Sequence, residues 1–242
     1  MNNTFCIAMP CYNESDGILE FLSEVLSSMQ TLDCKILVVD DNSRDSTPIL
    51  VKNFSMTNSN VHLLQNAKNQ GHGPSTIIGL KASLETGCSY IVSIDGDGQF
   101  FGDDILRITS QFAKLDVDII ECTRVGRAEP FFRRIVTLTT KMLVFLKTSR
   151  FPKDANTPFR IYRSEVLANL LLGVPDSSPV PNLEFSILAR RLGYKIKEES
   201  VQSRPRRGTS TIGSTWKSKQ NIVPSRRFLL FCVKALKRVV TL

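Results

Sequence analysis

The chain has 242 residues, of which 42% are hydrophobic and 22% charged, and its formal net charge is +8. This length predicts one large α/β domain or two small ones, and the composition excludes disordered and collagen-like classes. Residues 1–120 carry 7 Lys+Arg and 15 Asp+Glu, whereas residues 121–242 carry 24 and 8, so the two halves have net charges of −8 and +16. An acidic half suits a cation or nucleotide–metal site and a basic half suits an anionic partner, although a solvated basic surface would give the same composition.

Short apolar runs alternate with amphipathic segments along the first 125 residues. The runs have the length of strands, and several are apolar throughout, as expected for parallel strands covered on both faces. They are Phe5–Pro10, Lys35–Asp40, Val61–Gln65, Tyr90–Asp95 and Asp118–Thr123. The helix-like segments between them are Ser15–Gln30, Ser46–Asn53, Gly73–Thr86 and Asp103–Leu115. This alternation predicts an α/β fold with a mainly parallel sheet flanked by helices.

The second half is less regular. Phe131–Lys147 and Leu183–Leu192 have the spacing of amphipathic helices, and Asp154–Arg163 and Glu198–Gly213 indicate loops or strands. The last segment, Arg226–Leu242, interleaves apolar residues with five cations. It is too short and too charged to span a bilayer, but such a helix can lie in the membrane interface or pack on the domain.

Acidic residues follow the fourth apolar run. Asp95 and Asp97 lie one residue apart in a glycine-containing loop, with Gln99 two residues further on. Oxygen ligands of this kind suit Mg²⁺ or Mn²⁺, so these three residues are candidate metal ligands. A solvated Asp-Gly turn is the alternative for this peptide alone.

Polar loops also follow the other runs, where a sheet of this kind places its ligands. Asp40 and Asp41 end the second run, and Pro10-x-Tyr12-Asn13-Glu14 ends the first in the same manner. Gly71 lies in a glycine-rich loop that opens the third helix, where free N–H groups can approach an anion. Neither the dinucleotide-binding nor the P-loop glycine pattern is present.

Together these loops resemble the motifs of the inverting nucleotide-sugar glycosyltransferases of family 2. The matching segments are Pro10-x-Tyr12-Asn13-Glu14, Val39-Asp40-Asp41-x-Ser43-x-Asp45-x-Thr47, Asn69-x-Gly71 with Gly79, and Asp95-x-Asp97-x-Gln99. The resemblance implies a GT-A (Rossmann-like) domain over residues 1–215, with a nucleotide-binding half at 1–125 and an acceptor half at 126–215. Residues 216–242 would then form a basic amphipathic tail.

Further segments resemble the dolichol-phosphate mannose synthase and polyprenyl-phosphate glycosyltransferase branch of that family. They are Thr123-Arg124, Phe131-Phe132-Arg133-Arg134, Lys153-Asp154-x-x-x-x-Phe159-Arg160 and Arg206-Arg207-Gly208-Thr209-Ser210. Thr211 stands where this branch usually has lysine, and Arg204, Arg206 and Arg207 compete for one role. The Gln-x-x-Arg-Trp signature of processive polysaccharide synthases is absent.

The resemblance implies a role for each matched residue. Asp95, Asp97 and Gln99 would hold Mg²⁺ or Mn²⁺. A GDP- or UDP-sugar would contact a set of donor-side residues that shares Asp95 with the metal. They are Pro10, Tyr12, Glu14, Asp40, Asp41, Gly71, Asp95, Arg206 and Arg207. Asp97, Arg124 and Arg133 would be catalytic, the two arginines by binding the lipid phosphate. Glu184 would be a catalytic base only for a sugar hydroxyl, because a phosphate acceptor is already an anion at pH 7.

The function expected from these features is metal-dependent, inverting transfer of a sugar from a nucleotide sugar to polyprenyl (dolichyl or undecaprenyl) phosphate. One alternative uses a sugar hydroxyl acceptor in surface polysaccharide or glycolipid synthesis, and another is nucleotidyl transfer. A nucleic-acid-binding module would explain the basic half but leave the acidic loops without a purpose, so we expect no nucleic-acid partner.

Location follows from several absences in the sequence. No run of about 18 or more apolar residues occurs, and no cationic segment precedes the first apolar run. Six cysteines without CxxC spacing indicate a reducing compartment. We therefore expect a cytoplasmic protein that is peripheral on the cytoplasmic face of an anionic membrane.

Overall fold

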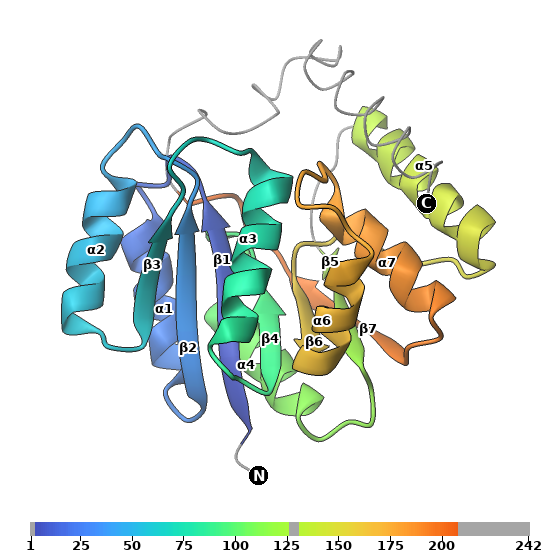
Figure 1. Ribbon diagram of the computed structural model, residues 1–242, viewed down its shortest axis with the longest axis horizontal. Coiled ribbons are helices and arrows are strands. Elements are labelled where there is room, and N and C mark those ends of the chain that lie inside the picture. The colour runs from blue at the N-terminus through green and yellow to red at the C-terminus, as the bar shows by residue number, and fades with distance from the viewer. Residues whose placement is uncertain (1–2, 126–130, 208–242) are drawn as a thin grey trace.

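The computed structural model describes residues 3–125 and 131–207, except for the side chains of residues 131–136. Within these ranges seven strands form one mixed sheet in the order β3-β2-β1-β4-β6-β5-β7 (Figure 1). They are β1 (Thr4–Cys11), β2 (Asp33–Asp40), β3 (Val61–Gln65), β4 (Tyr90–Ser93), β5 (Ile119–Val125), β6 (Arg160–Arg163) and β7 (Ile196–Gln202). β6 runs antiparallel to β4 and β5, and the other pairings are parallel.

Helices cover both faces of this sheet. They are α1 (Ile18–Met29), α2 (Thr47–Thr57), α3 (His72–Glu85), α4 (Gly102–Phe112), α5 (Phe131–Thr148), α6 (Ser164–Leu172) and α7 (Pro181–Arg191). Successive β1 side chains point to opposite faces: Phe5 and Ile7 pack in the core under α1 and α4, and Cys6 and Ala8 in the core under α3, α6 and α7. Burial on both faces explains why β1 is apolar throughout.

The observed elements confirm the predicted mainly parallel sheet flanked by helices. The third strand has the predicted bounds, but β4 ends two residues earlier than expected, at Ser93. The antiparallel insertion of β6 and the short helix α6 were not predicted. The sheet includes strands from both sides of residue 125, and the tail at 216–242 lies outside the described residues. In the described ranges, no helix is both long and apolar enough to cross a bilayer.

The start of α3 touches the loop before α7. A Cβ atom at Gly73 would lie 2.2 Å from the carbonyl oxygen of Ser178 and 2.8 Å from the carbonyl carbon of Pro179. Both neighbours are backbone atoms, so neither can turn aside as a flexible side chain can. Gly73 therefore lets the loop after β3 and the segment leading into α7 lie in direct contact.

We predict that Gly73→Ala destabilises the fold. The added methyl group must displace backbone of the 178–179 segment, and overpacking of this kind costs about 1–3 kcal/mol. Urea unfolding of the purified variant measures this loss as a lower midpoint. A midpoint equal to that of the wild type would show that the two segments are not in contact.

Candidate functional site

Backbone hydrogen bonds continue past the ends of β1, β2 and β4 and hold their loops together. Gly96 N–H donates to the Pro10 carbonyl at 3.0 Å, and Asp41 N–H donates to the Cys11 carbonyl at 3.0 Å. A Cβ atom on Gly96 would lie 2.9 Å from the Cys11 Cβ, so the approach of the two loops requires glycine. The polar loops after these strands therefore meet at one edge of the sheet, as predicted.

Asp95 and Asp97 form a carboxylate pair at this edge. Burial and, to a lesser extent, the nearby charge of Asp95 raise the pKa of Asp97 to about 6, although hydrogen bonding from Gln99 N–H opposes the shift. That N–H lies 3.2 Å from Asp97 Oδ1. Concentrated negative charge of this kind is relieved by a hard cation.

The donor set fits such a cation only if other molecules complete it. The described part of the chain contains no group of three or more His, Cys, Asp or Glu residues that could hold a metal ion. Mg²⁺ is commonly bound through one or two carboxylates, with water and substrate phosphate oxygens as its remaining ligands. The Asp95–Asp97 pair suits this type of site, and a metal role for Gln99 stays a prediction.

Glu14 and Arg206 face each other beside the carboxylate pair. Arg206 Nε lies 3.0 Å from Glu14 Oε2, and Arg206 Nη2 lies 2.5 Å from Oε1. Burial raises the pKa of Glu14 to about 8 despite this contact with the guanidinium group. The positive charge of Arg206 also opposes the rise in the pKa of Asp97, so Arg206 and the acids share one space.

The other two arginines of the same segment brace the loop instead. Arg204 donates to the Gly98 carbonyl at 2.7 Å and pairs with Glu24 at 2.7 Å. Arg207 pairs with Glu20 and Glu24, and its N–H donates to the Asp97 carbonyl at 3.0 Å. The sequence left three arginines in competition for one role. Of these, Arg206 is the one whose side chain lies beside Glu14 and the Asp95–Asp97 pair.

Asp40 and Asp41 differ in what they contact. Asp41 accepts hydrogen bonds from the N–H groups of Gln70 and Gly71, each at 2.8 Å. Gly71 has a φ of 91°, which favours glycine. Asp40 Oδ2 accepts from Ser43 N–H, but its buried Oδ1 has no hydrogen-bond partner among the described residues. Asp41 thus holds the glycine loop, and Asp40 keeps one buried carboxylate oxygen without a partner in the described part of the chain.

The structure places the acceptor candidates on β5, α5 and α7. Arg124, near the end of β5, lies 3.3 Å from Asp154 through Nη2 and Oδ2. Arg133 lies in α5, and its side chain is outside the described part. Glu184, in the first turn of α7, is fully buried and accepts a 2.6 Å hydrogen bond from the Ser178 hydroxyl. Tyr12 is half-buried in the loop after β1.

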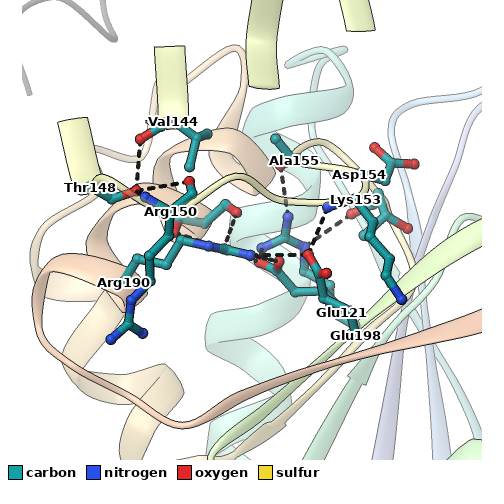
Figure 2. Close-up of polar contacts among 12 residues, drawn as sticks. Glu121, Val144, Thr148, Arg150, Lys153, Asp154, Ala155, Arg190 and Glu198 are labelled. Carbon is teal, nitrogen blue, oxygen red and sulfur yellow. Dashed lines mark hydrogen bonds and ion pairs between the residues drawn. The ribbon is translucent and has the colours of Figure 1, made fainter. Parts of the chain in front are cut away.

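A buried ion-pair network that was not predicted lies under the loop before β6, which carries Asp154. Glu121 lies between two guanidinium groups, Arg160 at 2.9 Å and Arg190 at 2.7 Å. Figure 2 shows Glu121 and Arg190 in this network. Burial favours a higher pKa for Glu121, but Arg160 and Arg190 outweigh it and hold the pKa below its ordinary value. Arg160 also donates to the Ala155 carbonyl at 2.9 Å, so it supports the loop that carries Asp154. The signal in the sequence is a glutamate inside the apolar run of β5.

A family model decides what kind of protein this is. The model described as "Glycosyl transferase family 2" matches residues 6–169, which is more than half of the chain. The chain belongs to this family. It is therefore a glycosyltransferase, and the resemblance found in the sequence is confirmed.

Related family members differ in how much of their length this glycosyltransferase spans. An uncharacterised protein of Methanocaldococcus jannaschii is 30% identical over 201 residues, covering 80% of this chain and 85% of the relative. A dolichyl-phosphate beta-glucosyltransferase of Trichomonas vaginalis is 23% identical, over 81% of this chain and 64% of its own length. An undecaprenyl-phosphate 4-deoxy-4-formamido-L-arabinose transferase of Sodalis glossinidius is 27% identical, over 81% and 58%. The chain thus spans less than two thirds of these two named transferases.

Solved structures confirm the GT-A fold. The glucosyl-3-phosphoglycerate synthase of Mycobacterium tuberculosis, in complex with Mn²⁺, uridine diphosphate and phosphoglyceric acid, superposes with a TM-score of 0.67 at 15% identity. That match covers 99% of this chain and 78% of the other. At this identity the likeness concerns the fold alone.

The buried network generates a stability prediction. Glu121→Gln leaves Arg160 and Arg190 without their shared carboxylate, and breaking a buried pair in this way costs about 3–5 kcal/mol. The pKa of Glu121 is lowered in the folded state, so its contribution is present at pH 7 and declines as the pH falls below about 4.3, the usual value for glutamate. Chemical unfolding of the wild type and the variant at pH 7, and again at a pH below about 4.3, measures the difference in their free energies of unfolding.

Glu199→Gln is the matched control. Glu199 lies on the neighbouring strand β7 and pairs with Lys197 at 2.8 Å, where both side chains are partly exposed to solvent. Loss of such a pair costs about 0–1 kcal/mol. Equal losses in the two variants would contradict the network.

Proposed function

We propose that this glycosyltransferase moves a sugar from a GDP- or UDP-sugar to a polyprenyl (dolichyl or undecaprenyl) phosphate, with inversion and with a divalent cation. The observation that carries the donor half of this proposal is the placement of Arg206 in one space with Glu14 and Asp97. A guanidinium beside a carboxylate pair suits a diphosphate that also shares a cation with those acids. The named substrates of the Trichomonas and Sodalis relatives support the acceptor half.

On the donor side, each residue has a distinct part. Arg206 exchanges its contact with Glu14 for the diphosphate oxygens, and its planar fork suits two of them at once. Asp40, Tyr12 and Pro10 lie on the side of the nucleoside. Asp95, Asp97 and Gln99 would hold the Mg²⁺ or Mn²⁺, which when bound offsets the charge of the leaving nucleoside diphosphate.

On the acceptor side, Arg124 and Arg133 bind the phosphate of the lipid. One of its oxygens attacks the anomeric carbon as the bond from that carbon to the nucleotide oxygen breaks, which inverts the configuration. The attacking oxygen is already anionic, so no group has to remove a proton. Asp154 orients Arg124 through the 3.3 Å contact between them.

A sugar hydroxyl is the second candidate acceptor, and the position of Glu184 favours it. This buried carboxylate is bonded to Ser178, whose carbonyl touches Gly73 at the start of α3. Glu184 is thereby linked to the loop after β3 on the donor side and would act as the base for a hydroxyl. Membership of a glycosyltransferase family argues against the other alternative, nucleotidyl transfer.

The proposed acceptor gives the enzyme a location. A polyprenyl phosphate is embedded in a membrane, so the glycosyltransferase would work as a peripheral protein on its cytoplasmic face. The basic segment Arg226–Leu242, outside the described residues, is one candidate for this contact.

We predict that activity requires a divalent cation and the Asp97 carboxylate. Asp97→Asn should lower kcat by about 10²-fold or more, a loss typical of removing stabilisation of the leaving group. Excess EDTA should abolish turnover of the wild type, and added Mg²⁺ or Mn²⁺ should restore it. Asp116→Asn is the control, because Asp116 is an exposed carboxylate in the loop before β5, at the opposite edge of the sheet from these loops. Full activity in EDTA would refute the metal assignment.

A second prediction separates the two substrates. Arg124→Ala should raise the KM for polyprenyl phosphate about tenfold or more with little change for the nucleotide sugar, since a charge-assisted contact contributes roughly 1.5–3 kcal/mol. Arg206→Ala should do the reverse. Steady-state kinetics with each substrate varied in turn measures both. Equal effects of either variant on the two KM values would remove that arginine from its assigned side.

A further inference from the structure

Helix α5 carries an uncovered apolar stripe. Leu138, Met142, Phe145 and Leu146 follow the spacing of one helical face, and 56%, 42%, 41% and 72% of their surfaces are exposed. Together with Phe151, they are five of the eleven exposed large apolar side chains in the described part of the chain. Single exposed apolar residues are common on protein surfaces, but a continuous patch indicates a contact.

The opposite face of α5 anchors it to the protein. Val144 is buried, and with the partly buried Leu143 it packs against Val180, Leu183 and Ile187 at α7. In Figure 1 α5 lies at the periphery of the fold, beside α7 and away from the sheet. The stripe therefore faces outward on a helix whose orientation is set by its packing.

The stripe continues into a basic cavity. The ring centroids of Phe145 and Phe151 lie 6.1 Å apart, and Phe151 borders an open cavity of about 400 Å³. The side chains that line the cavity are Arg150, Phe151, Lys153, Arg190, Ile196, Lys197 and Glu198. Arg190 pairs with Glu121 and Glu198, and Lys197 pairs with Glu199. Arg150 and Lys153 therefore carry the positive charge that an anion next to this apolar surface would meet.

The charge around the stripe selects among its possible partners. Residues 131–153 contain six Lys+Arg and no Asp or Glu. The segment 216–242 contains seven Lys+Arg and no acid, so it would repel this surface, as would the same face of a second copy. An apolar stripe in a segment whose charged residues are all cationic matches the interface of an anionic bilayer, where each basic residue near the surface contributes roughly 1 kcal/mol.

We propose that the α5 stripe and the turn at 149–153 form the surface by which this enzyme lies on an anionic lipid bilayer. Apolar side chains of the stripe enter the acyl boundary, and the basic cavity receives a lipid phosphate headgroup. This inference deepens the proposed function and rests on it for the role of Arg124. The turn at 149–153 leads directly to Asp154, which contacts Arg124. Docking here brings the proposed acceptor-binding arginine toward the surface that holds the polyprenyl phosphate.

Vesicle co-sedimentation of the full chain tests the proposal. The probes are phosphatidylcholine vesicles with and without phosphatidylserine, and the variant is Leu138→Glu with Leu146→Glu. We expect the wild type to sediment with the anionic vesicles and the double variant to bind about tenfold or more weakly, because two buried leucines are lost. Leu172→Glu is the matched control, since Leu172 is 87% exposed on α6, outside the stripe.

Two outcomes overturn the proposal. One is equal vesicle binding by the double variant and the wild type, including the case in which only removal of residues 216–242 abolishes binding. The other is a wild type that ignores anionic vesicles and forms a dimer that the double variant disrupts, which would assign the stripe to a second copy. Unfolding midpoints of both leucine variants exclude misfolding as the cause.

The same variants separate this proposal from the proposed function. The double variant should lose activity on vesicle-embedded polyprenyl phosphate and keep wild-type activity on a short-chain soluble analogue. If binding depends on the stripe but no polyprenyl phosphate is glycosylated in either form, docking stands and the proposed acceptor falls. Transfer that proceeds equally well on vesicles with the double variant overturns docking and leaves the acceptor in place.

Discussion

The structure depends on the crowding of acidic groups at the carboxyl edge of a parallel sheet. The ladders of β1, β2 and β4 run in the same direction, so their last hydrogen bonds bring the loops after all three strands together. Asp95, Asp97 and Glu14 are consequently held close, and the raised pKa values of Asp97 and Glu14 are the electrostatic consequence. Such a cluster is stable only with cations beside it.

Arginines supply much of that compensation, and they come from the basic half of the chain. Arg206 reaches the acids, and Arg204 and Arg207 clamp the Asp97 loop to α1 through Glu24. In the second half of the chain a similar arrangement lies in the interior, where Glu121 is held between Arg160 and Arg190. The ion pairs of Arg204, Arg206 and Arg207 with Glu14 and Glu24 therefore join the basic half to the acidic half and neutralise part of the charge of each.

Much of this was open to prediction because it follows from local patterns. The apolar runs of β1 to β5 and the acids that end them are local signals, and a parallel sheet then brings those acids to one edge. The roles of Arg204, Arg206 and Arg207 were not predictable, because residues adjacent in sequence point to different partners across the fold. The antiparallel β6 and the Glu121 network depend on contacts between distant segments, of which the sequence shows only a glutamate in an apolar strand.

Direct identification of the products tests the central claim most sharply. The wild-type protein is incubated with a panel of GDP- and UDP-sugars labelled in the sugar, each with and without polyprenyl phosphate and a divalent cation. The account predicts that one donor transfers its label to the lipid phosphate with inverted configuration and releases a nucleoside diphosphate. Release of the label as sugar 1-phosphate, the product expected of nucleotidyl transfer, or polyprenyl phosphate that stays unlabelled with every donor, would contradict it.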